Sequence, residues 1–154
     1  MIITRADTTD AAEILALQKT AYLSEAVIYQ DYAIPPLTQT LAELKDSFSR
    51  NTILKAVQDG RIVGSVNGRM SKGRCLIGRL MVHPERQGRG TGAALMRAIE
   101  AAFPEACCYR LFTGARSENN IRLYQKLGYR IFETKEVPGS FAIVFMEKPA
   151  PRRP

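Results

Sequence analysis

The amino-acid sequence predicts an α/β layered domain of the α+β type, in which helices lie over a largely antiparallel sheet. Apolar runs of strand length alternate along the chain with segments of helical period. Asp59-Gly60 separates two of these runs and is a strong hairpin signal. Between residues 74 and 103, a strand, a glycine-rich turn and a helix follow one another. We therefore expect one mixed, mostly antiparallel sheet of about six to seven strands, flanked by about four helices.

The first third of the chain is predicted to hold a short strand at residues 2–5 and two helices. Apolar residues at helical spacing indicate a first helix over residues 10–24. Thr38 or Thr40 is expected to cap a second helix that runs to about residue 48. The aromatic-rich segment 25–37 between them is interpreted as a loop or broken turn, because its Pro-Pro pair should stop any helix.

The rest of the chain supplies most of the sheet. Ser117 is a plausible N-cap for a helix over residues 118–127, and Gly128 suits the left-handed position beyond its end. The strands are expected at residues 52–58, 61–69, 74–83, 107–113, 129–133 and 141–147.

Composition limits the classes of protein that the chain can represent. Hydrophobic residues make up 45% and charged residues 24%, which is typical of a globular domain, and we expect it to cover residues 1–148 with a frayed Pro/Arg-rich tail at 149–154. No apolar run approaches the length of a membrane span and no signal-peptide pattern is present, so we expect a soluble, cytoplasmic protein without a membrane partner. Cys75, Cys107 and Cys108 are interpreted as free, buried thiols in a reducing compartment.

Two further partners are not expected. A single histidine and no Cys-x-x-Cys pattern argue against a metal site. The net charge of +7 invites a nucleic-acid interpretation, but the basic residues are spread along the chain rather than gathered in one run. We therefore expect neither a bound metal nor a nucleic-acid partner.

The glycine-rich turn is the strongest functional signal. It carries Gly88, Gly90 and Gly92, with Arg86 and Arg89 interleaved, directly before a helix. The first turn of a helix has backbone N–H groups without intrahelical partners, and the helix dipole adds partial positive charge there. Glycine permits the required backbone dihedral angles, and arginine matches phosphate oxygens well. We expect a pyrophosphate-like group over residues 87–93.

Several phosphate-binding motifs compete for this turn. A Walker A loop would need Gly-Lys followed by Ser or Thr, which is absent. A dinucleotide fingerprint is formally matched by Gly88-x-Gly90-x-x-Ala93, but the following strand candidate, residues 107–112, ends without the acidic residue that would bind ribose. A decorated surface turn without a ligand is the bland alternative.

A third motif fits the surroundings as well as the turn. Gln87-x-x-Gly90-x-Gly92 follows Leu-Met-Val-His-Pro-Glu and precedes an amphipathic helix, and this arrangement resembles the coenzyme A loop of the GCN5-related N-acetyltransferase (GNAT) family. The resemblance covers roughly residues 50–147. It implies a GNAT-like fold with acetyl-CoA as cosubstrate and no metal. The implied coenzyme contacts are Leu80, Met81, Val82, Gln87, Gly88, Arg89, Gly90, Thr91, Gly92, Ala93 and Asn120.

The helix near the C-terminus carries a second resemblance. Its run Asn-Ile-Arg-Leu-Tyr-Gln-Lys-Leu-Gly-Tyr is similar to the GNAT motif that closes over the pantetheine arm, and Asn120 and Tyr124 share a helix face. The family role implied for Tyr124 is protonation of the departing thiolate, which suits a phenol that is neutral at pH 7. The chain departs from the family by placing Ser117, rather than Asn, seven residues before Tyr124. A helix aromatic that only packs on the sheet is the alternative for Tyr124.

The general base and the acceptor are less well defined. We assign no base: Glu25, Asp31 and Glu133 are all candidates, and His83 is interpreted as a surface histidine. In the family the segment between the first two helices lines the acceptor cleft, which implies contacts from Tyr29, Asp31 and Tyr32. Aromatic rings with a carboxylate would suit a small cationic amine. Loop packing is the alternative for these three residues.

The resemblance implies an acetyl-CoA-dependent N-acetyltransferase in which a primary amine, expected to belong to a small molecule, attacks the thioester directly. A covalent acetyl-cysteine route is disfavoured because no histidine partners Cys75, Cys107 or Cys108 in the pattern. The alternative from another class is a non-catalytic acyl-CoA-binding sensor or scaffold. A homodimer is common in the family and stays open for this chain.

Overall fold

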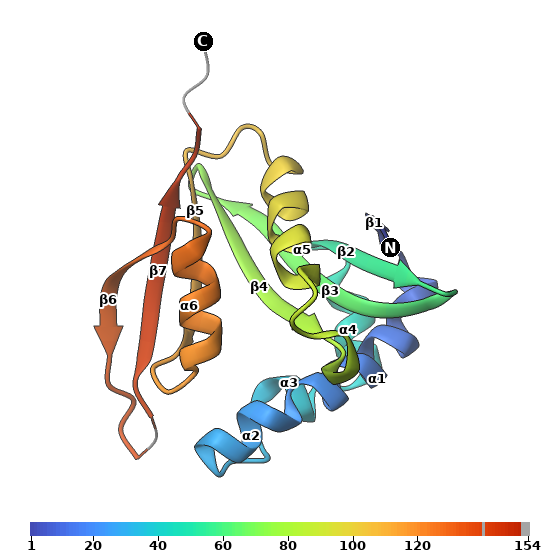
Figure 1. The fold of residues 1–154 in the computed structure, drawn as a ribbon, viewed down its shortest axis with the longest axis horizontal. Helices are drawn as coiled ribbons and strands as arrows, with labels where there is room; N and C mark the ends of the chain where they lie inside the picture. The colour runs from blue at the N-terminus through green and yellow to red at the C-terminus, as the bar shows by residue number, and fades with distance from the viewer. Residues whose placement is uncertain (140, 152–154) are drawn as a thin grey trace.

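The computed structural model describes residues 1–139 and 141–151, which fold around one seven-stranded sheet with the strand order β1-β2-β3-β4-β5-β7-β6 (Figure 1). All neighbouring strands are antiparallel except β4 and β5. The mixed, mostly antiparallel sheet is therefore confirmed. Its strands are β1 (Ile2–Arg5), β2 (Thr52–Gln58), β3 (Arg61–Ser71), β4 (Arg74–Val82), β5 (Cys108–Gly114), β6 (Arg130–Lys135) and β7 (Ile143–Pro149).

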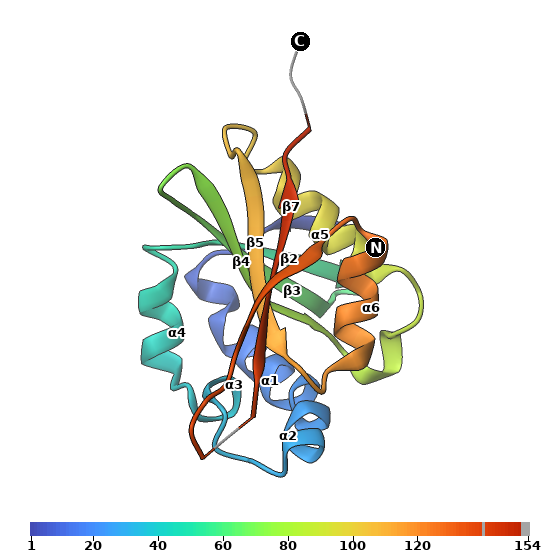
Figure 2. The same cartoon turned by 90° about the vertical axis from the view of Figure 1, so that its left-hand side faces the viewer.

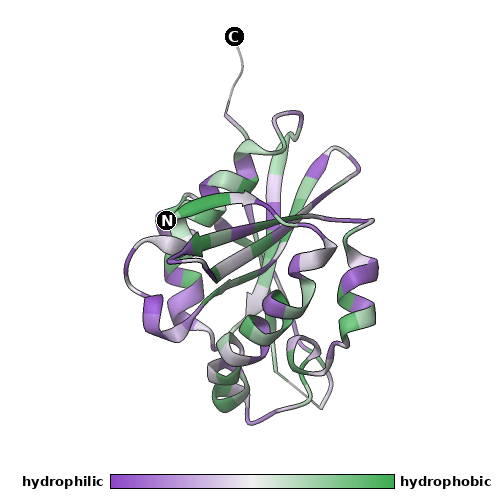
Figure 3. Ribbon diagram, turned by 90° about the vertical axis from the view of Figure 1, so that its right-hand side faces the viewer, coloured by the Kyte–Doolittle hydropathy of each residue, from purple (hydrophilic) through white to green (hydrophobic). Residues whose placement is uncertain are grey.

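Helices cover both faces of the sheet. Figure 2 shows α1 and α4 on one face and α5 and α6 on the other. Each face has its own apolar core: Ile14 and Leu44 pack on one side, and Leu95, Met96 and Ile99 on the other. Figure 3 shows hydrophobic residues concentrated along the strands and interleaved with hydrophilic ones along the helices. The helices are η1 (Thr8–Asp10), α1 (Ala11–Ala21), α2 (Leu23–Tyr29), α3 (Pro35–Thr38), α4 (Leu41–Ser47), η2 (Pro84–Arg86), α5 (Thr91–Ala101) and α6 (Glu118–Lys126).

The centre of the sheet is split. Strands β4 and β5 pair only at Cys75 with Tyr109 and Leu76 with Arg110, and they diverge beyond this point (Figure 1). On the other side of β4, the register with β3 shifts, and Arg79 adopts the left-handed conformation with φ of 52°, as expected of a β-bulge. The split leaves one edge of β4 without a strand partner.

The sequence interpretation of segment 25–37 as a loop is wrong. Residues 23–29 form α2, which follows α1 directly through Tyr22, and residues 35–38 form α3. Pro35 and Pro36 start this helix instead of stopping it, because proline at the first helical position lacks only an N–H that would be unpaired there. Because residues 23–29 form a helix, α2 lies against the split in the sheet.

Most other local predictions are confirmed. Asp59 and Gly60 both have positive φ, as a two-residue hairpin turn requires. Thr40 caps α4, and its hydroxyl accepts a hydrogen bond from the Glu43 N–H while the Glu43 carboxylate accepts one from the Thr40 N–H. Gly128 has φ of 101° just beyond α6. The three cysteines are free thiols, and Cys75 and Cys108 are buried as predicted; the predicted burial of Cys107 is wrong, because this residue lies just before β5 and is exposed.

The last strand ends close to the predicted domain boundary at residue 148. Strand β7 continues through Pro149, and residues 152–154 of the predicted tail lie outside the described residues. Among the helices of the described part of the chain, none is long and apolar enough to cross a membrane.

Candidate functional site

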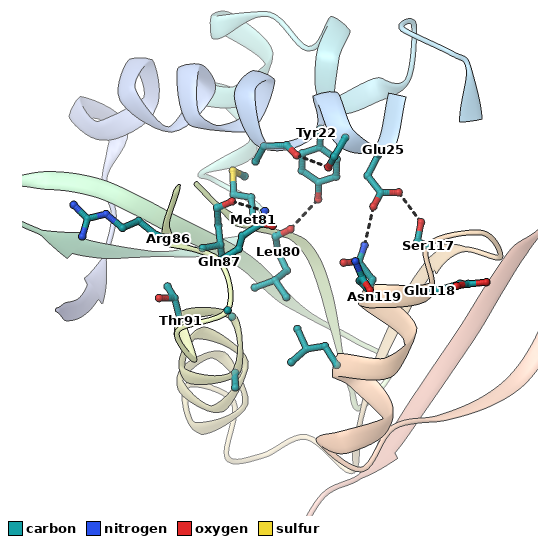
Figure 4. A pocket seen from close by; sticks show the side chains of 18 of the residues that line it. Tyr22, Glu25, Leu80, Met81, Arg86, Gln87, Thr91, Ser117, Glu118 and Asn119 are labelled. Carbon is teal, nitrogen blue, oxygen red and sulfur yellow. Dashed lines mark hydrogen bonds between the residues drawn. The ribbon is translucent and has the colours of Figure 1, made fainter. Parts of the chain in front are cut away.

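A cavity of about 770 Å³ lies at the split in the sheet (Figure 4). Its wall is formed by the free edge of β4, the glycine-rich loop with the first turn of α5, the N-terminal end of α6, and the adjoining parts of α1 and α2. This volume is within the range of small-molecule and cofactor sites. The split between β4 and β5 therefore opens directly into a space that can hold a ligand.

The loop end of the cavity is built to accept an anion. Gly88 and Gly90 have φ of 75° and 82°, a conformation that glycine adopts without strain. Gly90 is the N-cap of α5, which has neither a side-chain cap hydrogen bond nor an acidic residue in its first turn. The N–H groups at the start of this helix therefore have no side-chain acceptor, and the helix dipole favours negative charge beside them.

Two side chains fix the loop to the sheet. The Gln87 amide donates a hydrogen bond to the Val82 carbonyl over 3.2 Å. Arg86 lies 3.7 Å from the carboxylate of Asp59 in the β2–β3 turn, and its side chain is 26% exposed. Both Arg86 and Gln87 line the cavity. The loop is therefore held in place and adds a cation near the start of α5.

Tyr22 closes the cavity from the side of α1. Its hydroxyl donates a hydrogen bond to the Leu80 carbonyl over 3.1 Å, at the bulge of β4 (Figure 4). Burial raises the pKa of Tyr22 to about 12, with the charge of Arg79 acting in the opposite direction. The phenol therefore stays protonated at neutral pH and ties the helix pair α1–α2 to the edge strand.

The α6 end of the cavity contains a hydrogen-bonded chain between two helices. The Ser117 hydroxyl donates to the Glu25 carboxylate over 2.5 Å and lies 2.7 Å from the Tyr29 hydroxyl. The Arg116 N–H donates to the Tyr29 oxygen over 3.1 Å, and the Asn120 amide donates to the second Glu25 oxygen over 3.2 Å. Because Ser117 gives its proton to Glu25, Tyr29 must donate to Ser117. This chain joins α2 to the start of α6.

Most residues of the predicted coenzyme site meet in this cavity. Arg89 does not line it; its side chain is exposed on the loop. The predicted contacts that line the cavity are Leu80, Met81, Val82, Gln87, Gly88, Gly90, Thr91, Gly92, Ala93 and Asn120.

Tyr124 lies in the apolar core and is not among the residues that line the cavity. The residue is 7% exposed, and its ring meets the edge of Tyr129 with 6.0 Å between ring centroids. Burial raises the pKa of the Tyr124 phenol well above its usual value, and the nearby Tyr22 and Glu25 raise it further. Tyr124 therefore holds its proton at neutral pH and is close enough to the α2 side of the cavity to respond to charge there.

The three predicted acceptor residues have other surroundings and do not line this cavity. Tyr29 contacts Ser117 and packs on Phe141, with 4.2 Å between ring centroids. Asp31 accepts a hydrogen bond from the Ala33 N–H, as in a local turn, and Tyr32 is 63% exposed. Their role in acceptor binding stays a prediction.

Sequence reasoning named Glu25 as a base candidate and Tyr29 as an acceptor contact, but it missed Tyr22 and the helix α2 that joins these residues to α6. Tyr22, Glu25 and Tyr29 are separated by three and four residues, which is the spacing of one helix face. That spacing could have revealed α2, but the Pro-Pro pair that follows obscured it. His83 is half-buried and caps η2, where its ring Nδ1 accepts a hydrogen bond from the Glu85 N–H over 3.1 Å. Within the described residues, no group of three His, Cys, Asp or Glu side chains could hold a metal ion.

The chain is similar in sequence to proteins from bacteria. A protein from Bacillus subtilis named UPF0157 protein YqkA is 28% identical over 140 residues, which is 90% of this chain but 40% of that protein. This chain therefore spans about two fifths of the length of that relative. An acetyltransferase from Yersinia pestis is 34% identical over 94 residues, covering 60% of this chain and 67% of that protein.

A solved structure supports the fold. The PaiA N-acetyltransferase from Thermoplasma acidophilum, crystallised in complex with coenzyme A, superposes with a TM-score of 0.80 at 19% identity, covering 97% of this chain and 99% of that one. The model of the acetyltransferase (GNAT) family matches residues 12–129, which include the glycine-rich loop, the split strands and α6. The chain therefore belongs to the GNAT acetyltransferase family.

Proposed function

We propose that this chain is an acetyl-CoA-dependent N-acetyltransferase that transfers the acetyl group to a primary amine of a small molecule by direct attack on the thioester. One observation carries the proposal: the uncapped start of α5 and the free edge of β4 face the same cavity. An anion site beside an unpaired strand edge suits a ligand that joins a pyrophosphate to an amide-containing arm.

The described residues fit coenzyme A along its length. The first turn of α5, with Gly88, Gly90 and Arg86, would hold the pyrophosphate. The backbone of Leu80 to Val82 would pair with the amides of the pantetheine arm as an added strand does. When bound, acetyl-CoA supplies a thioester whose carbonyl carbon an amine can attack, with a thiolate as the leaving group.

Tyr124 would act on the leaving group. Its raised pKa keeps the phenol protonated throughout the neutral range, so a proton is present when the thiolate leaves. A buried thiolate is also more basic than one in water, which favours proton transfer from the phenol. Tyr124 is therefore the proposed catalytic acid.

Calorimetric titration tests the cofactor assignment. Acetyl-CoA should bind in the micromolar range, whereas NAD and ATP should not bind. Release of free thiol from acetyl-CoA with a panel of primary amines should then show turnover. Binding of NAD or ATP instead would return the loop to the nucleotide alternatives, and acetyl-CoA binding without turnover by any amine would favour a non-catalytic acyl-CoA-binding module.

Removing the phenol of Tyr124 tests its role. In Tyr124→Phe, kcat should fall about 100-fold, within the usual range for loss of a general acid, while acetyl-CoA affinity stays unchanged. The control is Tyr109→Phe, which also removes a phenol hydroxyl from the core. That hydroxyl donates a hydrogen bond to the Glu100 carbonyl of α5. Wild-type turnover in Tyr124→Phe would eliminate the acid role.

A further inference from the structure

Two carboxylates line the cavity, and they differ in what surrounds them. Glu118 has a side chain that is 82% exposed and lies 3.9 Å from Arg122 on the outer surface of α6. Glu25 extends from α2 toward Ser117 at the start of α6 (Figure 4). Only Glu25 is therefore a half-buried carboxylate held against the interior of the cavity.

Both oxygens of Glu25 are fixed by donors from α6. Ser117 binds one oxygen over 2.5 Å, and Asn120 binds the other over 3.2 Å. An ionised carboxylate has about four lone-pair sites, so each oxygen retains acceptor capacity beyond these bonds. Among the described residues, no cation forms an ion pair with Glu25. The carboxylate is held in place but its charge is not paired.

Glu25 carries this charge on the same cavity wall as the residues next to the free edge of β4. Tyr22, three residues earlier on the same helix pair, donates to the Leu80 carbonyl on the edge of β4. Glu25 is also close enough to Tyr124 to raise the pKa of its phenol. A positively charged group bound to Glu25 would therefore lie in the same cavity as the free edge of β4.

The opposite end of the cavity has the opposite electrostatic character. The start of α5 has no acidic residue in its first turn and has Arg86 nearby, whereas the α6 end has two carboxylates, Glu25 and Glu118, with Arg116 as its one cation among the described lining residues. A ligand that is anionic at one end and meets a cationic partner at the other would match both ends of this cavity.

We propose that Glu25, oriented by Ser117 and Asn120, binds the ammonium group of the acceptor, and that the acceptor is therefore a small cationic amine. This inference rests on the proposed acetyltransferase function and names the substrate class and a residue that receives it. Ser117 and Asn120 are positioning residues, because they act through the carboxylate. An ammonium group pairs with a fixed carboxylate through charge-assisted hydrogen bonds. The bound ammonium must then release a proton to solvent, because only the neutral amine has the lone pair that attacks the thioester carbon.

Glu25→Gln tests the charge without removing the side chain. The measurements are the KM of a primary alkylamine, the KM of aniline, which is neutral at pH 7.5, and the calorimetric Kd of the alkylamine for protein saturated with coenzyme A. Glu25→Gln should raise the alkylamine KM and Kd at least 10-fold, and leave the values for aniline and acetyl-CoA within 2-fold. Glu136→Gln is the matched control, since it makes the same charge change at an exposed position outside the cavity, and should leave all constants within 2-fold.

Three results would overturn the inference. Unchanged alkylamine constants in Glu25→Gln, with an active wild-type enzyme, would remove Glu25 from the acceptor site while the proposed function stands. Equal losses with alkylamine and aniline, together with a lower Tm, would assign Glu25 to the structural joint between α2 and α6. A wild-type protein that acetylates none of the amines would overturn the proposed function, and the inference with it.

Discussion

The N-terminal ends of α5 and α6 face the same cavity, yet the chain completes them in opposite ways. Neither helix has a side-chain cap hydrogen bond to its first N–H groups. At α5 the cap is Gly90 and the first turn carries no acid. At α6 the cap is Ser117, whose hydroxyl is directed to Glu25, and Glu118 follows in the first turn. One helix end is left open to anions, and the other already has carboxylates beside it.

The difference shows that a helix N-terminus is an anion site only where the surrounding side chains leave it so. The backbone dipole is similar in both helices, but carboxylates near α6 offset its partial positive charge. The two ends therefore divide the cavity into a part that favours phosphate and a part that favours a cation. This division can be broken at either end by single substitutions.

The largest expected effect comes from placing a carboxylate at the open end. Ala93 lies in the first turn of α5 and lines the cavity. In Ala93→Asp, repulsion between the new charge and a bound pyrophosphate should cost about 3 kcal/mol, which weakens acetyl-CoA binding about 100-fold. Folding stability should not fall, because an acidic residue in the first turn favours the helix. Calorimetry and thermal unfolding measure the two quantities.

The control for this substitution is Ala102→Asp, at the exposed C-terminal end of the same helix. It adds the same charge far from the first turn, so acetyl-CoA affinity should stay within 2-fold. If Ala93→Asp binds acetyl-CoA as the wild type does, the pyrophosphate does not lie at the start of α5.

A smaller effect is expected from breaking the contact between α2 and the start of α6, at the cation-favouring end of the cavity. A Cβ atom at Gly114 would lie 1.9 Å from the Tyr29 hydroxyl oxygen, too close for both to stay in place. Gly114→Ala should therefore displace Tyr29 and its bonds to Ser117 and the Arg116 N–H, at a cost of about 2 kcal/mol of folding stability. The alkylamine KM should rise, while acetyl-CoA affinity is retained.

A double-mutant cycle separates this contact from other effects of the alanine. Tyr29→Ala removes the hydroxyl that the new Cβ would strike. Gly114→Ala should then cost much less in the Tyr29→Ala background than in the wild type, as measured by urea unfolding. Additive costs would show that Gly114 is needed for a reason other than Tyr29.

The same contrast explains what could be predicted from the sequence. The anion-binding end of the cavity is formed by one continuous segment. Strand, glycine turn and helix follow one another within 30 residues, so the motif and its lining residues could be predicted. Glu25 and Ser117 are 92 positions apart, and Tyr29 and Ser117 are 88 apart. No local pattern encodes such a contact, and the Pro-Pro pair concealed the short helix that makes it.

Arg79 and Tyr124 show the same limit at single residues. The positive φ of Arg79 belongs to a bulge that depends on pairing with β3; Gly78 beside it is a sign of a bulge, but no sequence pattern assigns the left-handed conformation to the arginine. The helix face of Tyr124 could be predicted. Its burial in the core, however, depends on packing against Tyr129 and the other core residues. Local conformation was predictable where one segment determines it, and the assembly of distant segments was not.

The smallest effect is expected at a third helix start, which is capped in the usual way and lies away from the cavity. Thr40→Ala should cost about 1 kcal/mol of folding stability, the usual value for loss of an N-cap, and leave the acetyl-CoA and amine constants unchanged. Hydrogen bonds from Thr40 lower the pKa of Glu43 below its usual 4.5. Because the folded state holds this carboxylate ionised, its contribution is present above the unfolded pKa and is lost as pH falls through the folded one. Thr40→Ala keeps the backbone N–H, the larger cause of the shift, and removes only the side-chain hydrogen bond. The stability difference between wild type and Thr40→Ala, measured by urea unfolding, should therefore be constant near neutral pH and shrink slightly as pH falls below the usual carboxyl pKa of 4.5. A change in either ligand constant would show that α4 supports the cavity, contrary to the division between the two ends.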